Sequence, residues 1–199
     1  MPEVQCSENS DLLCVEHECG YSLPMTPHIL ITDEAFDITC GILGIAGNRC
    51  DCLVVTIEKN KRMLRAIFIV ELKGVKKLQR EASNCPKKDV QACIIEKWLG
   101  KVRNCAACAE RLTVKLGGLH TATKFVVLAL PITRLQEKYR RALSDFLRRF
   151  VASFRDQLCN ELQSLLGHHI MLQLYDCEHR FVYGKVACKL RTPGHYRAT

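Results

Sequence analysis

The sequence predicts a mixed α/β protein in which a mixed sheet is flanked by helices, and two observations support this class. First, residues 50–58 and 65–73 have strand patterns that are separated by a polar turn at 59–62, as in an antiparallel hairpin. Second, helical and buried-strand patterns alternate after this hairpin. Antiparallel strands followed by helix, strand and helix are typical of a sheet that packs against helices.

The other expected elements are predicted mainly by the spacing of their apolar residues. The helix at 88–102 is the clearest of them, because Val90, Ile94 and Trp98 recur at helical spacing. In chain order, the remaining expectations are a short strand or helix and then a first strand within 28–46, a loop that holds Cys105, Cys108 and 117–118, a strand at 124–130, a helix at 133–166, a strand at 169–174 and a hairpin-like end at 180–188.

The size and composition of the chain predict an ordinary globular protein. Its 199 residues are enough for one domain with a core, and its hydrophobic fraction is 48%. No apolar run approaches the roughly 18 to 20 residues of a membrane helix. The first six residues are polar and acidic, unlike those of a signal peptide. We therefore expect a soluble, cytoplasmic protein that does not bind membranes.

Thirteen cysteines are many for such a chain, and they predict bound metal, small buried side chains, or the intracellular disulfides of a thermophile. Residues 1–27 have too few apolar side chains for a core, so we expect a cysteine-rich appendage before a main domain at 28–199. Two sets of residues have the spacing of zinc ligands, and disulfides explain the same residues equally well. These residues are Cys105 and Cys108 in one set and Cys14, His17 and Cys19 in the other.

Three residues of the predicted hairpin, Asp51, Glu71 and Lys73, should meet at one point. Folding the hairpin about Lys61 places Asp51 opposite Glu71, and Lys73 shares their face because side chains two apart on a strand point the same way. Two opposed carboxylates repel each other on an apolar face, and a cation would relieve that cost. The pattern predicts a divalent-metal site for phosphodiester hydrolysis. The alternative is a surface ion pair, which contributes little.

The motif lies at the end of the predicted hairpin, with Asp51 at the start of one strand and Glu71-Leu72-Lys73 at the end of the next. This arrangement resembles the motif of the PD-(D/E)xK nuclease superfamily, which includes restriction-type endonucleases and Holliday-junction resolvases. The resemblance covers roughly residues 28–135 as an order of elements. It implies a restriction-endonuclease-like sheet and a nuclease that depends on Mg²⁺ or Mn²⁺. It also implies that Asp51, Glu71 and the Leu72 carbonyl bind the metal. Lys73 would then position the attacking water, help to deprotonate it, or stabilise the phosphate.

The same resemblance implies two further catalytic residues. The superfamily often adds an upstream acid from a helix, for which Glu34 is the best candidate, with Asp33 and Asp37 as rivals. It also often has a glutamine or lysine on the helix after the motif, and Gln91 or Gln79 could fill that place. A loop carboxylate and an exposed helix glutamine are the alternative interpretations.

Basic residues on the expected helix at 133–166 suggest a nucleic-acid partner. Together with the net charge of +8 they favour contact with a polyanionic backbone, which the resemblance identifies as DNA, whereas a solvated helix face is the alternative. Superfamily members that cut duplexes often pair two active sites, so the resemblance also allows a homodimer. The basic residues are Arg134, Lys138, Arg141, Arg148 and Arg155.

Two other functions remain open at the level of the sequence. The chain could be a non-catalytic nucleic-acid-binding or assembly subunit that retains a nuclease-like fold. It could also be an interaction protein that zinc or disulfides hold together, in which the motif is accidental. Cleavage of DNA that requires a divalent metal separates the nuclease from both alternatives.

Overall fold

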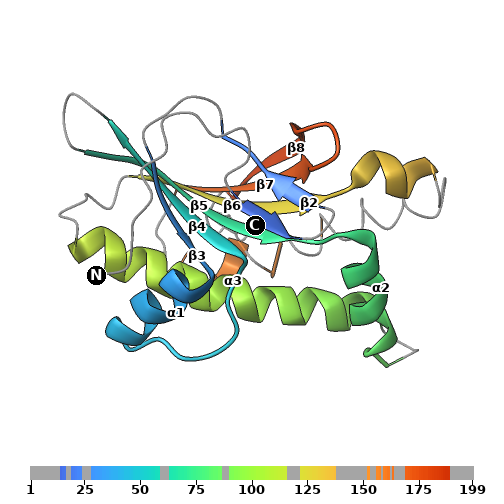
Figure 1. Ribbon diagram of the computed structural model, residues 1–199, viewed down its shortest axis with the longest axis horizontal. Helices are drawn as coiled ribbons and strands as arrows, with labels where there is room; N and C mark the ends of the chain where they lie inside the picture. Colours follow the sequence, from blue (N-terminus) through green and yellow to red (C-terminus); the bar gives the residue numbers. More distant parts are fainter. Residues whose placement is uncertain are drawn as a thin grey trace, which may run out of the picture.

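A computed structural model describes residues 14–16, 19–23, 28–58, 63–86, 90–115, 122–137 and 169–188, together with single positions between 152 and 163 (Figure 1). The described elements, in chain order, are β1 (Cys14–Glu16), β2 (Cys19–Tyr21), β3 (His28–Thr32), α1 (Asp33–Ile42), β4 (Cys52–Glu58), β5 (Met63–Leu72), α2 (Val75–Ser83), α3 (Val90–Lys115), β6 (Thr123–Leu130), β7 (Ile170–Asp176) and β8 (Phe181–Cys188).

The main sheet has six strands in the order β3-β4-β5-β6-β7-β8. The strands β3, β4 and β5 form an antiparallel meander, β6 and β7 run parallel to β5, and β8 returns antiparallel to β7. In the β4–β5 hairpin, Leu53 lies opposite Ile69 and Val55 opposite Ile67, which is the register expected from the sequence. The turn at 59–62 lies outside the described residues. The prediction of a mixed sheet flanked by helices is confirmed.

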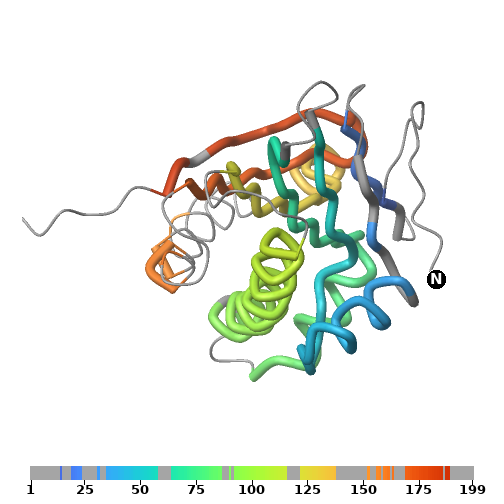
Figure 2. The backbone as a smooth tube through the Cα atoms, turned by 90° about the vertical axis from the view of Figure 1, so that its left-hand side faces the viewer, coloured from blue at the N-terminus to red at the C-terminus, as the bar shows by residue number. Residues whose placement is uncertain are grey.

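The two faces of the sheet bury different partners, because side chains alternate along each strand. Leu53, Val55, Ile67 and Ile69 face one core, which α3 and α1 cover. Alternate residues of the same strands, such as Val54 and Val70, face the second core beneath the β1–β2 hairpin, and Figure 2 shows α3 and this hairpin on opposite sides of the sheet.

Disulfides attach the N-terminal hairpin to the sheet. Cys14 is bonded to Cys52 at the start of β4, and Cys19 is bonded to Cys177 just after β7. A hairpin of two three-residue strands has too little apolar area to be stable by itself, so these bonds and the burial of Tyr21 against the sheet order it. Cys14 and Cys19 are therefore disulfide-bonded and are not zinc ligands.

The helix α3 differs most from its prediction. It begins at Val90, near the expected start, but continues to Lys115 and includes Cys105 and Cys108, which the sequence analysis placed in a loop. That prediction was wrong because the small side chains of 105–109 look like an interruption in the hydrophobic spacing. They instead belong to the buried face of the helix, where Cys105, Cys108 and Ala109 are fully buried.

The second half of the chain follows the prediction where it is described. β6, β7 and the β7–β8 hairpin occupy the expected segments, and residues 132–137 are helical directly after Pro131. Described positions between 152 and 163 are also helical. Residues 117–118 and 138–151 lie outside the described residues. Among the described residues, no helix is long and apolar enough to cross a membrane.

Candidate active site

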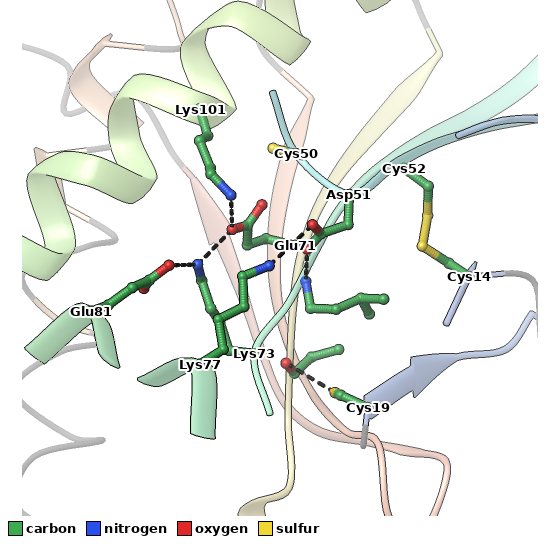
Figure 3. A network of polar contacts seen from close by, with 12 residues as sticks. Cys14, Cys19, Cys50, Asp51, Cys52, Glu71, Lys73, Lys77, Glu81 and Lys101 are labelled. Atoms are coloured by element: carbon green, nitrogen blue, oxygen red, sulfur yellow. Dashed lines mark hydrogen bonds and ion pairs between the residues drawn. A yellow bond between two sulfur atoms is a disulfide. The ribbon is translucent and has the colours of Figure 1, made fainter. Parts of the chain in front are cut away.

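The end of the β4–β5 hairpin brings Asp51, Glu71 and Lys73 together (Figure 3). Glu71 lies on β5, two residues beyond Ile69, so its side chain points to the α3 side of the sheet. Lys73 follows β5, where its backbone N–H donates to the Ala129 carbonyl at 2.9 Å. Asp51 precedes β4, and its Oδ2 accepts a hydrogen bond of 2.6 Å from the Leu72 N–H. The Leu72 peptide therefore belongs to the site as a donor to Asp51.

Three lysines neutralise the carboxylates at this point. The Lys73 Nζ lies 2.8 Å from Glu71 Oε1 and also pairs with Glu81. The Lys101 Nζ donates to the same Glu71 oxygen at 2.6 Å, and the Lys77 Nζ lies 3.2 Å from Asp51 Oδ1. These six groups make up a charge network: Lys101, Glu71, Lys73 and Glu81 form a continuous run of ion pairs, and Asp51 and Lys77 form a separate pair beside it (Figure 3).

Trp98 completes the network from α3. Its indole N–H donates to Glu81 Oε2 at 3.0 Å, and the Lys73 Nζ lies 5.3 Å from the centre of its ring. A cation over an indole face is stabilised by the ring quadrupole, most strongly where water is excluded. Both the Trp98 and Lys73 side chains are buried, so Trp98 fixes the position of Lys73 and of its partner Glu81 together.

Burial dominates the electrostatics of Glu71, which is 2% exposed. Burial and then the neighbouring charge of Asp51 raise the pKa of Glu71, although Lys73 and Lys101 act in the opposite direction. Burial by itself would lower the pKa of Lys101, but the nearby acidic groups, Glu71 foremost and then Asp51, together outweigh it and raise that pKa. Glu71 Oε2 is buried and has no hydrogen-bond partner among the described residues. A buried acceptor in this state is costly, so the site favours an additional cation or donor.

The donor set fits a hydrated Mg²⁺ ion better than a closed metal cage. Asp51 and Glu71 offer carboxylate oxygens, which suit this ion, and Mg²⁺ keeps several waters when only two carboxylates bind it. Among the described residues, no three His, Cys, Asp or Glu side chains are grouped to hold a metal ion. Lys77 contacts Asp51 Oδ1 and Lys101 contacts Glu71 Oε1, so an ion that binds these two oxygens would share them with the lysines or displace the lysines, whereas Glu71 Oε2 has no such competitor among the described residues.

Sequence reasoning missed four residues of this network: Lys77, Glu81, Trp98 and Lys101. Lys77 and Glu81 are four residues apart on α2, and Trp98 and Lys101 are three apart on α3, so each pair lies on one helix face. This spacing can be recognised in the sequence, but it does not show which helix faces pack against the end of the hairpin. Lys73 is buried between Glu71 and Glu81 because α2 and α3 both pack at this end of the sheet.

The remaining predicted residues are placed as follows. Glu34 lies in the first turn of α1 and Gln91 in the first turn of α3, and the side chains of both lie outside the described residues. Arg134 lies in the helical segment 132–137, half-exposed, with its Nε 3.6 Å from Glu178 Oε1. The other basic residues of that expected stripe lie outside the described residues, namely Lys138, Arg141, Arg148 and Arg155.

The two predicted sets of zinc ligands are not brought together. Cys14 and Cys19 lie in the core beneath the β1–β2 hairpin, whereas Cys105 and Cys108 lie in the core on the α3 side. The sheet separates the two sets, and His17 lies outside the described residues. Cys105 and Cys108 are free thiols.

Replacing Glu81 with glutamine is expected to lower the free energy of unfolding by about 1–2 kcal/mol at pH 7, because charged hydrogen bonds are lost. Although burial raises the pKa of Glu81, the bonds from Lys73 and Trp98 outweigh it and lower that pKa. A lowered pKa in the folded state gives stability that is present above the unfolded value and is lost as the pH falls through the folded value. The difference between wild type and variant should therefore shrink below pH 4.5, the ordinary value.

Urea unfolding at several pH values measures this effect. Glu137→Gln serves as the control, because Glu137 is exposed and outside the network, and it should behave as wild type. A difference between Glu81→Gln and wild type that stays constant from pH 7 to below pH 4.5 would show that the charge of Glu81 does not stabilise the fold.

Comparison of the chain with protein-family models, with curated proteins and with solved structures found no match.

Proposed function

We propose that this protein is a nuclease that hydrolyses phosphodiester bonds in DNA and depends on Mg²⁺ or Mn²⁺. The observation that carries the proposal is the meeting of Asp51, Glu71 and Lys73 at one end of the β4–β5 hairpin, with Glu71 Oε2 buried and without a hydrogen-bond partner among the described residues. A pair of carboxylates beside a lysine matches the motif of the PD-(D/E)xK superfamily at these three positions.

Each residue of the network has a role in this proposal. Asp51 and Glu71 would hold the metal, which when bound stabilises negative charge on the phosphate and lowers the pKa of a coordinated water. Lys73, fixed by Glu81 and Trp98, would orient the attacking water or the phosphate. Lys101 and Lys77 would place further positive charge near the phosphate once they release the carboxylates. The Leu72 N–H holds Asp51 in place.

The fold and the overall charge support the same proposal. The resemblance implies antiparallel strands that carry the motif, followed by helix and strand, and β4, β5, α2, α3 and β6 follow this order. The strand β6 pairs in parallel with β5 and supports the segment that holds Glu71 and Lys73. The net charge of +8 favours a polyanionic partner.

A cleavage assay tests the proposal. Purified protein is incubated with end-labelled single-stranded, duplex and branched DNA, with Mg²⁺, with Mn²⁺ or with a chelator. Cleavage of at least one substrate is expected with metal, and none with the chelator. Equal cleavage in the chelator would indicate a contaminating or metal-independent enzyme. Binding without cleavage of any substrate would exclude the nuclease.

The lysine contacts favour a second candidate, a non-catalytic nucleic-acid-binding subunit. Lys101 and Lys73 both contact Glu71 Oε1, and Lys77 contacts Asp51, so three ammonium groups already balance the carboxylates. In such a protein the network would stabilise the fold and would not bind metal. Saturable DNA binding with an unchanged affinity when Mg²⁺ replaces the chelator, and with no cleavage, is the outcome expected for this candidate.

A further inference from the structure

Four free thiols lie buried on the α3 side of the sheet, outside the charge network. They are Cys40 on α1, Cys50 directly before Asp51, and Cys105 and Cys108 on α3, and none is more than 4% exposed. The other eight cysteines of the described residues form four disulfides, so most of the described cysteines are already oxidised.

The four thiols approach each other as two pairs. The Cys40 Sγ lies 3.3 Å from the Cys108 Sγ. The Cys50 backbone N–H donates to the Cys105 Sγ at 2.8 Å, which brings the Cys105 thiol against the residue that carries the Cys50 thiol. Because Cys105 and Cys108 are three residues apart on α3, they lie on one face of the helix, and each meets a partner from a different segment.

We propose that these thiols are two cross-linking sites, which close as the disulfides Cys40–Cys108 and Cys50–Cys105. Bonded sulfurs lie about 2.05 Å apart, so the first pair has to approach by roughly 1.3 Å, a change within reach of side-chain rotation. The first bond would join α1 to α3. The second would join the residue before Asp51 to the helix that carries Lys101, and would hold one side of the charge network covalently.

The oxidation proceeds by thiol–disulfide exchange with a low-molecular-weight disulfide. One cysteine thiolate attacks a sulfur of that disulfide, forms a mixed disulfide and releases one small thiol. The partner cysteine then attacks the protein sulfur and releases the second small thiol. Each protein pair loses two protons and two electrons, and the small disulfide is reduced by two electrons. Burial raises the pKa of Cys40 and Cys108, so we expect exchange of this pair in the folded protein to be slow at neutral pH and faster as the pH rises.

Disulfide mapping tests the pairing. The protein with these thiols free is incubated with oxidised glutathione at a pH of about 8.5, quenched in acid, unfolded, alkylated and analysed by mass spectrometry. The expected result is the loss of four hydrogen atoms, with peptides that link Cys40 to Cys108 and Cys50 to Cys105. Full alkylation of all four thiols, or a Cys105–Cys108 bond within α3, would overturn the proposal. One bound zinc per chain that protects the four thiols from alkylation would also overturn it.

Single substitutions show whether the two bonds are independent. In Cys40→Ala the Cys108 thiol should stay open to alkylation while Cys50–Cys105 still forms, and in Cys105→Ala the reverse pattern is expected. Closing loops of 68 and 55 positions should raise the Tm of wild type by roughly 5–10 °C on oxidation, and by about half of that in either variant. An unchanged Tm after complete oxidation would contradict the cross-linking role, and the wild-type map decides the pairing if a variant does not fold.

Discussion

Replacing Glu71 with glutamine is expected to reduce metal-dependent DNA cleavage about 1,000-fold while DNA binding is retained. A bound metal stabilises the transition state by several kcal/mol, and a loss of about 4 kcal/mol corresponds to roughly that factor in rate. Glutamine has the same size and keeps one acceptor oxygen for Lys73 and Lys101, so the fold should survive the change. Single-turnover cleavage with Mg²⁺ measures the rate, and fluorescence anisotropy in a chelator measures binding.

The matched control for this substitution is Glu96→Gln. Glu96 is exposed on α3 and lies outside the charge network, so this variant should cut and bind DNA as wild type does. If Glu71→Gln cuts at the wild-type rate, Glu71 does not bind the catalytic metal, and the proposed nuclease site is wrong. If it loses both cleavage and binding, circular dichroism decides whether the variant has unfolded.

Replacing Lys73 with methionine is expected to lower the free energy of unfolding by about 3–5 kcal/mol at pH 7. The Lys73 ammonium is 0% exposed and pairs with both Glu71 and Glu81, so its removal leaves carboxylates facing each other with one cation fewer. Methionine fills the space of the lysine stem, which limits the effect of a cavity. Urea unfolding followed by tryptophan fluorescence is a direct measurement, because Trp98 lies against Lys73.

Two further variants separate charge from packing. Lys115→Met removes an exposed lysine at the end of α3, away from the network, and should change stability by no more than about 0.5 kcal/mol. The double variant Lys73→Met with Glu81→Gln should be less destabilised than the sum of its single variants, because one unpaired carboxylate is gone. A loss below about 1 kcal/mol for Lys73→Met would refute the view that Lys73 holds these acids together.

Local patterns were sufficient to predict the hairpin and its end. Alternating apolar residues on both sides of a polar turn determine which residues face each other, because a slip by one position would expose a whole face of the strand. The pairing of Leu53 with Ile69 follows from this constraint, and it places Asp51 next to Leu72 and Glu71. The strands β6 and β7 could also be predicted, because each is a short apolar run.

Local patterns could not predict how the helices contact this end of the sheet. The buried face of α3 contains small residues, so the helix looked like a loop at Cys105 and Cys108, although it continues to Lys115. The contacts of Glu81 and Lys101 with the motif residues span 8 and 30 positions, and they depend on where α2 and α3 pack. The pairing of cysteines could not be predicted for the same reason, because sequence spacing does not determine which thiols lie close together in the folded chain.

The register of the β4–β5 hairpin can be read from local sequence patterns, and with it the meeting of Asp51, Glu71 and Lys73, because the two-residue period of a strand fixes which side chains share a face. The surroundings of these residues depend on tertiary contacts: the burial of Glu71, the lysines that neutralise it, and the division of the described cysteines into four disulfides and four free thiols. These features arise from contacts between distant segments, whose geometry is set by core packing.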